Sequence, residues 1–231
     1  MSCTVVITQP TYLPWLGYFE QMARADKFIF LDSVQFERRS WQCRNRLKDA
    51  REEPFWLTVP LQAQPQSTLI QDIRISTDQP HWRKKHLVSL QTCFARAPFF
   101  PAVFPAFQQW LEADQAMLAE LNIAGIKMTA ELLGLRPQFL RASQLGVNGR
   151  RSELLVNLCR AVGATHYYSA LGSKSYLEEV LFTEHQISVA FQTWEHPAYT
   201  QSGITFVSHL AAVDALMNLG PAATRALLST P

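Results

Sequence analysis

The sequence lacks most features that mark membrane, secreted or nucleic-acid-binding proteins. Its 231 residues contain no run of about eighteen apolar residues, so no membrane-spanning helix is expected. Residues 1–4 lack the basic start and small-residue cleavage site of a secretory signal. The net charge is only +2, which gives no general reason to expect a nucleic-acid partner. We therefore expect a cytoplasmic protein whose partner is a small anionic molecule, and the sequence leaves its oligomeric state open.

Cysteine and histidine are also too sparse, or too scattered, for a structural framework. The four cysteines lie far apart and form no Cys-x-x-Cys pair: Cys3, Cys43, Cys93 and Cys159. This spacing fits neither a disulfide scaffold nor a zinc site, and buried, reduced thiols are the expectation. The six histidines show no ligand spacing either. The sequence therefore predicts no structural metal.

What the chain does contain is an alternation of short apolar runs with segments of helical periodicity, which predicts an α/β protein with a parallel, Rossmann-like sheet and helices on both faces. We expect a single domain over residues 1–231. The predicted strands are 4–8, 27–31, 55–61, 69–75, 138–141, 166–170 and 187–192. The predicted helices outside the middle of the chain are 16–24, 152–162, 176–184 and 206–219, the last one ended by Gly220-Pro221.

The middle of the chain is predicted to be helical. Helical spacing covers residues 81–97, 106–113 and 115–135, with a proline-aromatic corner at residues 98–101. Residues 80–135 therefore predict a helical insertion or lid within the domain. The segment 69–75 just before it alternates apolar and polar residues, which is typical of a half-exposed edge strand.

The connection after the first strand, TQPTYLPWLGYF at residues 8–19, carries more aromatic residues than a plain turn needs. In parallel sheets, ligands bind beyond the carboxyl ends of the strands, where this stretch is expected to lie. Gly17 would let a ligand approach the helix start. A proline-stiffened turn whose aromatic side chains cap the core is an equally good interpretation. The candidate ligand contacts here are Gln9, Tyr12, Trp15, Gly17 and Tyr18.

The stretch DSVQFERRSWQCRNRLK, residues 32–48, concentrates five basic side chains against two acids, Asp32 at its start and Glu37 within it. Guanidinium groups bind phosphate and carboxylate through paired hydrogen bonds, and an adjacent indole can stack on a planar ring. A solvated basic loop is the alternative, but the polar and aromatic residues among the arginines favour a site. The candidate ligand contacts here are Gln35, Arg38, Arg39, Trp41, Arg44 and Asn45, and Asp32 is the candidate base or metal-facing carboxylate.

Two later stretches follow predicted strands. In SALGSKSYL, residues 169–177, Ser173, Lys174 and Ser175 could bind an anion at a helix start, although helix capping explains the serines equally well. Lys174 is the second catalytic candidate. In QTWEHPAYTQ, residues 192–201, Glu195 and His196 are adjacent and would point apart on an extended backbone, so we favour no acid-base role for them.

Four ordered stretches together resemble the WbqC-like family over essentially the whole chain: ITQPTYLPWLGYF, ADKFIFLDSVQFERRSWQCRNRLK, GSKSYL and SHLAAVDALMNLG. The resemblance implies a setting in bacterial cell-surface polysaccharide biosynthesis, where proteins of this family would modify or acylate sugars. The layout is also similar to nucleotidyltransferases such as pantothenate synthetase. Trp15 and Tyr18 stand where that superfamily has its two histidines, and only Gly17 of that motif matches.

These resemblances imply a nucleotidyltransferase-like sheet and a WbqC-like enzyme. It would transfer an acyl, aminoacyl or similar small group to a nucleotide-linked or otherwise activated sugar. One alternative is an ATP-dependent, adenylate-forming ligase or nucleotidyltransferase, and another is a non-catalytic nucleotide or sugar-nucleotide binding protein. The cofactor is unknown, with ATP and Mg²⁺ or a sugar nucleotide as the options. No metal ligand is assigned.

Overall fold

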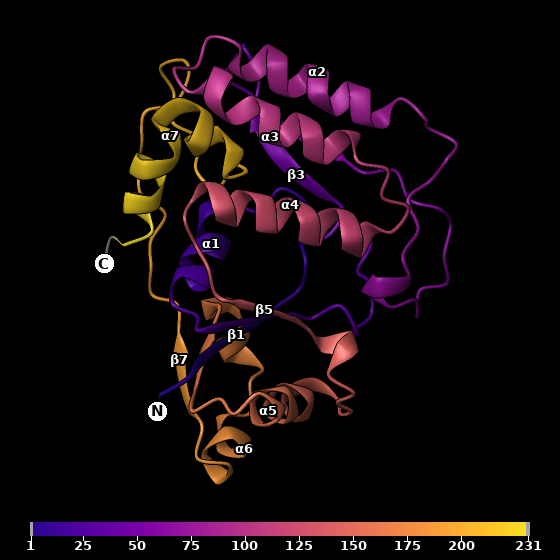
Figure 1. Cartoon of the computed structure of the whole chain (residues 1–231), viewed down its shortest axis with the longest axis vertical. Coiled ribbons are helices and arrows are strands. Elements are labelled where there is room, and N and C mark those ends of the chain that lie inside the picture. The colour runs from indigo at the N-terminus through magenta and orange to yellow at the C-terminus, as the bar shows by residue number, and fades with distance from the viewer. Residues whose placement is uncertain (1, 230–231) are drawn as a thin grey trace.

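The computed structural model of the chain describes residues 2–229 and is built around a parallel sheet of five strands in the order β5-β2-β1-β6-β7 (Figure 1). In chain order this is 3-2-1-4-5, so the direction of strand addition reverses between β1 and β6. The sheet strands are β1 (Thr4–Thr8), β2 (Lys27–Phe30), β5 (Gln138–Arg141), β6 (His166–Ser169) and β7 (Ser188–Phe191). This topology confirms the predicted α/β fold with a Rossmann-like core.

Helices cover both faces of the sheet, as predicted (Figure 1). On β1, Val6 faces one apolar cluster, which includes residues of α1 (Leu16–Ala23) and α4 (Leu118–Leu132). Val5 and Ile7 face the other cluster, which includes residues of α5 (Arg151–Ala161) and α6 (Glu179–Glu184). A strand buried on both faces needs a continuous apolar run, which is why Val5, Val6 and Ile7 stand together.

The basic stretch after β2 contains a strand that the sequence did not predict. β3 (Arg44–Lys48) pairs antiparallel with β4 (Pro54–Thr58), and the two form a separate hairpin outside the main sheet. The prediction of a strand at 55–61 was therefore right in place, but its strand belongs to this hairpin. Leu47 and Leu57 point to the core, whereas Arg44, Arg46 and Trp56 lie on the outer face of the hairpin.

The predicted edge strand at 69–75 is wrong. The structure has a short 3₁₀ helix, η1 (Ile70–Asp72), flanked by single bridges between Gln35 and Leu69 and between Leu61 and Ile75. Ile70, Ile73 and Ile75 are all buried, so the apolar residues face the core through a turn and not through the alternation of a strand. The other two short 3₁₀ helices are η2 (Ala142–Gln144) and η3 (Leu171–Ser175).

The middle segment is helical, as predicted, with shifted ends. It contains α2 (Trp82–Phe94), α3 (Phe100–Glu112) and α4, and the expected corner at 98–101 overlaps the first turn of α3. Asn122 of α4 donates hydrogen bonds to the carbonyls of Pro10 (3.1 Å) and Gln42 (2.7 Å), so α4 is tied to the turn after β1. The single-domain organisation and the treatment of residues 80–135 as an insertion or lid stay predictions.

The last helix, α7 (Val213–Leu227), begins later than predicted and continues past Gly220-Pro221. Gly220 has φ of 78° and marks a kink between two helical pieces, so the glycine-proline pair bends the segment and does not end it. A Cβ on Gly220 would lie 2.5 Å from the Phe99 ring, which also favours glycine there.

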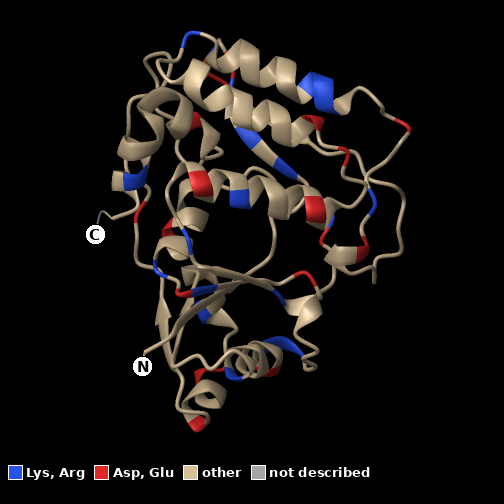
Figure 2. Ribbon diagram, in the orientation of Figure 1, with Lys and Arg blue, Asp and Glu red and all other residues tan. Residues whose placement is uncertain are grey.

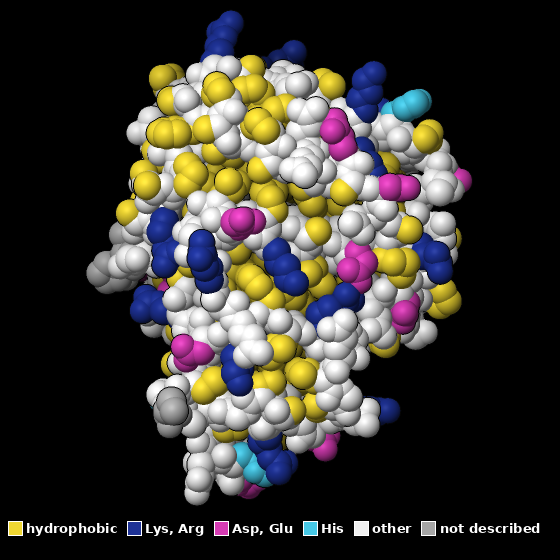
Figure 3. All heavy atoms as spheres, in the orientation of Figure 1, with side chains coloured by type: hydrophobic (Ala, Val, Ile, Leu, Met, Phe, Trp, Pro, Cys, Tyr) yellow, Lys and Arg dark blue, Asp and Glu magenta, His cyan; other side chains and the backbone are white. Residues whose placement is uncertain are grey.

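Within residues 2–229, no helix is long and apolar enough to cross a membrane. Basic and acidic side chains are interspersed over the face in Figure 3, which agrees with the small net charge. Electrostatic recognition of a partner must therefore come from local groups of side chains.

Candidate functional site

The turn after β1 is buried, and its aromatic side chains have partners in the protein. Tyr12 is fully buried, and its hydroxyl is hydrogen-bonded to Nδ1 of His86 at 2.7 Å. Tyr18 is also buried and donates to the carbonyl of Gln9 at 3.2 Å. Burial raises the pKa of both tyrosines above the ordinary range, so both hydroxyls are neutral. In this arrangement the two side chains shape the core below the site and do not face a ligand.

Asn45 holds this turn in an unusual conformation. Leu13 has a positive φ of 45°, which is rare for a residue with a branched side chain. The buried Asn45 amide donates to the carbonyls of Tyr12 (3.3 Å) and Leu13 (2.5 Å). Such strain persists only where the surroundings fix it. Asn45 thus positions the turn from the neighbouring hairpin.

Gly17 is explained by the packing of Trp15. A Cβ on Gly17 would lie 2.2 Å from Cη2 of the Trp15 ring, so any other residue would displace the indole. The half-buried Trp15 ring packs 5.8 Å from Trp194, is stacked 6.0 Å from His196 and lies 4.9 Å from His209. Trp15 therefore connects the start of α1 to the C-terminal part of the chain.

Asp32 is completely buried at the carboxyl end of β2, and hydrogen bonds use both of its oxygens. Oδ2 accepts from Nε of Arg141 (2.8 Å) and from the Ser143 hydroxyl (2.8 Å), and it forms an ion pair with Nη2 of Arg141 (2.8 Å). Oδ1 accepts from the Ser143 amide (2.9 Å). Arg141 also pairs with Glu120. A carboxylate occupied by a guanidinium does not fit a Mg²⁺ ligand, and Asp32 serves here to join β2 to β5 and η2.

Arg38 and Arg39 lie in a pocket of about 260 Å³, here called the arginine pocket. It is lined by Phe36, Arg38, Arg39, Cys43, residues 61–66 and Ile73. A second hollow of about 540 Å³ shares Phe36, Arg38 and Gln66 with it and adds Gln35 and Glu37. The structure therefore brings together three of the predicted ligand contacts: Gln35, Arg38 and Arg39.

The arginine pocket combines cationic, amide and apolar groups. Nη2 of Arg38 donates to the Gln64 carbonyl at 2.8 Å, which fixes the arginine against the glutamine-rich segment 61–66. Among the described residues, neither Arg38 nor Arg39 has an acidic partner within salt-bridge distance. Burial raises the pKa of the Cys43 thiol, so it is not poised as a nucleophile. The arrangement is suited to binding an anion attached to a hydroxyl-rich or planar group.

Gln42 connects this pocket to the end of β1. Its Nε2 donates to Oε1 of Gln9 at 2.7 Å, and its Oε1 accepts from the amide of Glu37 at 3.1 Å. Gln9 is thus held next to the loop that carries the arginines, at the carboxyl edge of the sheet where ligands of this fold class bind.

The other predicted contacts lie elsewhere. Trp41 and Trp56 form an exposed pair with ring centroids 5.3 Å apart on the hairpin, and the guanidinium carbon of Arg44 lies 4.2 Å from the Trp56 ring. The Lys and Arg positions along the ribbon of β3 are blue in Figure 2. Neither Trp41 nor Arg44 lines the arginine pocket. They form a second basic and aromatic surface.

The Gly-Ser-Lys-Ser loop forms η3 after β6. The hydroxyls of Ser173 and Ser169 are hydrogen-bonded at 2.8 Å, and Ser173 also donates to the Ala170 carbonyl. Ser175 donates to the Gly172 carbonyl at 3.3 Å. Lys174 is exposed, with Nζ 5.7 Å from the Phe191 ring, and it does not line the arginine pocket. The serines therefore stabilise the loop in this arrangement.

Glu195 and His196 do not form a pair. His196 packs among aromatic rings, and both of its ring nitrogens are buried without a hydrogen-bond partner among the described residues. Burial, with a smaller effect from nearby His209, lowers the pKa of His196 to about 4. The imidazole is therefore neutral at physiological pH.

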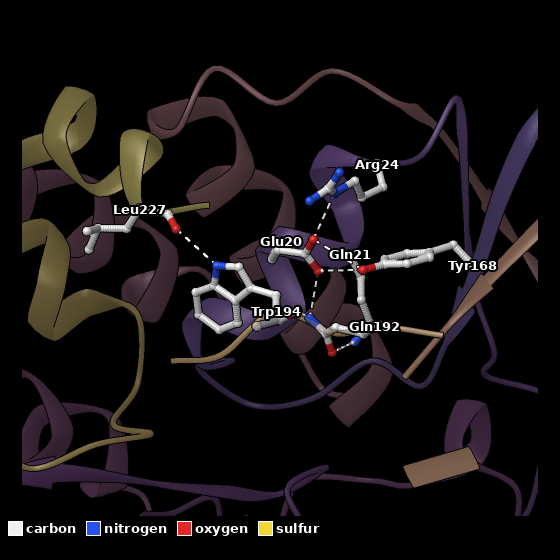
Figure 4. Close-up of polar contacts among 8 residues, drawn as sticks. Glu20, Gln21, Arg24, Tyr168, Gln192, Trp194 and Leu227 are labelled. Carbon is white, nitrogen blue, oxygen red and sulfur yellow. Dashed lines mark hydrogen bonds and ion pairs between the residues drawn. The ribbon is translucent and has the colours of Figure 1, made fainter. Parts of the chain in front are cut away.

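One polar cluster at the carboxyl edge of the sheet was missed from the sequence. Glu20 of α1 is completely buried and accepts hydrogen bonds from Gln192 (2.7 Å), the Tyr168 hydroxyl (3.2 Å) and Arg24 (2.9 Å) (Figure 4). Burial, followed by the negative charge of Glu20, raises the pKa of Tyr168 to about 12. Glu20 lies one turn after Leu16, on the apolar side of a short helix. This position of a charged residue was the feature of the sequence that could have revealed the cluster.

The sequence profile of the WbqC-like protein family matches residues 9–226. The chain belongs to this family. It is also 30% identical over 219 residues to Uncharacterized protein Rv1507c of Mycobacterium tuberculosis (strain ATCC 25618 / H37Rv), covering 94% of each chain. No solved structure matches this WbqC-like chain significantly.

Proposed function

We propose that this WbqC-like protein transfers an acyl, aminoacyl or similar small group to a nucleotide-linked or otherwise activated sugar. The observation that carries the proposal is the arginine pocket, where two guanidinium groups without acidic partners among residues 2–229 lie beside apolar and amide side chains. The setting implied by the family resemblance, bacterial cell-surface polysaccharide biosynthesis, supports a sugar as the substrate.

Each part of a sugar nucleotide has chemically matching side chains in the arginine pocket. Arg38 and Arg39 would bind the phosphates, because guanidinium groups match phosphate oxygens through paired hydrogen bonds. The amides of residues 61–66 would bind sugar hydroxyls, and Phe36 would pack against a ring. The pocket of about 260 Å³ and the adjoining hollow of about 540 Å³ together provide the space that a ligand of this size needs.

Binding of nucleoside diphosphate sugars tests the first step. Isothermal titration calorimetry should detect binding of at least one such sugar, and Arg39→Gln should weaken it about tenfold or more, because a charged hydrogen-bonded contact contributes about 1.5–3 kcal/mol. The matched control is Arg136→Gln, an exposed arginine outside the pocket. Equal weakening by the two variants, or none by Arg39→Gln, would show that the pocket is not the site.

Mass spectrometry of the bound sugar nucleotide, incubated with acyl and aminoacyl donors, tests the transfer. A mass increase that matches the donated group is the expected result. Binding without any mass change would favour a second candidate, a non-catalytic binding protein. One observation supports that candidate: the predicted base Asp32 is fully occupied by Arg141 and Ser143. ATP-pyrophosphate exchange, if detected, would instead indicate the adenylate-forming ligase.

A further inference from the structure

A second cleft, here called the charged cleft, lies where the β3–β4 turn, the end of α2 and the start of α7 meet. Its volume is about 630 Å³. The charged or reactive side chains that line it are Lys48, Asp49, Glu52, Cys93, Arg96 and Asp214. None of these was singled out from the sequence as a ligand contact, apart from the general basic character of residues 32–48. Oδ1 of Asp49 accepts from the amides of Arg51 and Glu53. The charged cleft shares no lining residue with the arginine pocket.

Two buried side chains of opposite charge line this cleft. Lys48 is 5% exposed and Asp214 is 1% exposed. Among the described residues they form no ion pair with each other or with any other side chain. Charged groups are rarely buried without a partner, because loss of hydration then goes uncompensated. Lys48 acts to lower the pKa of Asp214, so the two charges attract each other, and a ligand that carries both charges would add a closer partner to each.

Both groups keep unused hydrogen-bonding capacity. Nζ of Lys48 donates to the Thr205 carbonyl at 2.6 Å, which uses one of its three hydrogens. Oδ1 of Asp214 accepts from the Tyr199 hydroxyl (2.9 Å) and from Asn218 (3.4 Å), whereas Oδ2 receives no hydrogen bond from residues 2–229. Burial raises the pKa of Asp214 to about 6, against the opposing effects of Tyr199, Lys48 and Asn218. A cation at Oδ2 would stabilise the ionised form.

One wall of the cleft is fixed in place. Glu52 accepts hydrogen bonds from the amides of Ile204 (2.9 Å) and Thr205 (2.8 Å), which fastens this segment to the β3–β4 turn. Gly203 has φ of 89°, and a Cβ there would lie 2.5 Å from Oε1 of Glu52. Glycine suits this backbone conformation, and a Cβ there would displace the Glu52 carboxylate. The hydrogen bonds of Glu52 hold this wall of the cleft against the β3–β4 turn.

We propose that the charged cleft binds a small zwitterion of amino-acid type. Its ammonium group would pair with Asp214. Its carboxylate would pair with Lys48 and with Arg96, which is exposed and lies in the connection between α2 and α3. The proposal goes beyond the sugar-nucleotide site and holds whether or not the arginine pocket binds its ligand.

Cys93 provides a reporter in the unmodified protein. Its thiol lines the cleft, is only partly exposed and has a pKa raised to about 11 by burial, so alkylation with iodoacetamide at pH 9 is slow and measurable. Cys3 is also partly exposed but lies outside the cleft and serves as the internal control. Peptide mass spectrometry follows both sites separately.

The probes are the L-amino acids other than cysteine, whose thiol would consume iodoacetamide, each at 10 mM or at its solubility limit. At least one is expected to slow alkylation of Cys93 severalfold without changing that of Cys3. The corresponding acid without the amine, and the corresponding amine without the carboxylate, should each protect Cys93 much less. No protection by any amino acid, or equal protection by the deaminated acid, would overturn the proposal, and neither comparison depends on a variant that must fold.

Variants then locate the contact. Asp214→Asn keeps the shape of the side chain and should raise the concentration needed for half-protection about tenfold or more, since it removes the anionic partner. Asp78→Asn, an exposed aspartate that does not line the cleft, is the matched control. Unchanged protection in Asp214→Asn, with the melting temperature confirming that the variant is folded, would contradict the assignment of Asp214.

Discussion

Replacing Asp32 with asparagine should destabilise the fold strongly, although the two side chains have nearly the same shape. In the native protein, Oδ2 of Asp32 accepts from two nitrogens of Arg141 and from the Ser143 hydroxyl, and Oδ1 accepts from the Ser143 amide. Asparagine replaces one of these acceptors with a donor. In either orientation of the amide, the NH₂ group of the asparagine then faces at least one donor of Arg141 or Ser143.

These contacts set the expected loss in the free energy of unfolding. Breaking a buried ion pair by removing one partner costs about 3–5 kcal/mol. Arg141 retains its contact with Glu120, so we expect a loss near the lower end of that range, about 3 kcal/mol. The whole stability of a typical domain is about 5–15 kcal/mol, so the variant should still fold.

Urea unfolding followed by tryptophan fluorescence measures this free energy. Asp78→Asn on the surface is the control, and it should change the free energy of unfolding by no more than about 0.5 kcal/mol. A double-mutant cycle with Arg141→Met should show that the two losses are not additive, because the second substitution removes the unpaired guanidinium. A loss below about 1 kcal/mol for Asp32→Asn, or additive losses in the cycle, would refute the structural role assigned to this carboxylate.

Two further predictions concern the turn after β1. Gly17→Ala should lower the free energy of unfolding by about 1–3 kcal/mol, because the new methyl group meets the Trp15 ring, and Trp15→Phe should relieve part of this loss in the double variant. Equal stability of Gly17→Ala and the native protein in urea would contradict that packing. Burial lowers the pKa of His86 to about 4, against about 6.5 in the unfolded chain. The contribution of the neutral His86 to the free energy of unfolding is therefore complete above pH 6.5. It is lost as the pH falls through 4, by about 3 kcal/mol in total. His86→Gln should flatten the pH dependence of stability over that window, and an unchanged acid limb in pH-dependent urea unfolding would contradict this.

The sequence predicted the core of the fold because local and global signals agree there. Val5, Val6 and Ile7 form a run that is apolar on both sides, as a central parallel strand requires. β3 was missed because its residues alternate arginine with Asn45 and Leu47, so that only one apolar side chain marks the inner face. Its strand conformation comes from pairing with β4, a contact that no local pattern reveals.

The structure distributes the predicted site residues over several surfaces. Arg38 and Arg39 were marked by local charge density, and they do share a pocket. Asp32 was taken as a free carboxylate because its partner, Arg141, lies 109 positions away in the chain. Trp41 and Arg44 are close to the pocket residues in sequence, but they lie on the hairpin surface together with Trp56. The sequence supplied the chemical groups, whereas their distribution among surfaces depends on the tertiary structure.

The position of β1 between β2 and β6 has a consequence for synthesis on the ribosome. Val5 pairs with Tyr167, a residue about 160 positions later, which emerges roughly 8–30 s afterwards at about 5–20 residues per second. During this interval one edge of an apolar strand has no neighbour, although β2 is already available on its other side. A nascent chain in this state is a substrate for chaperones and a risk for aggregation. Slower translation lengthens this interval, and a missing chaperone leaves the exposed strand unprotected. Either change should therefore reduce the yield of folded protein, even where the stability of the finished fold is unchanged.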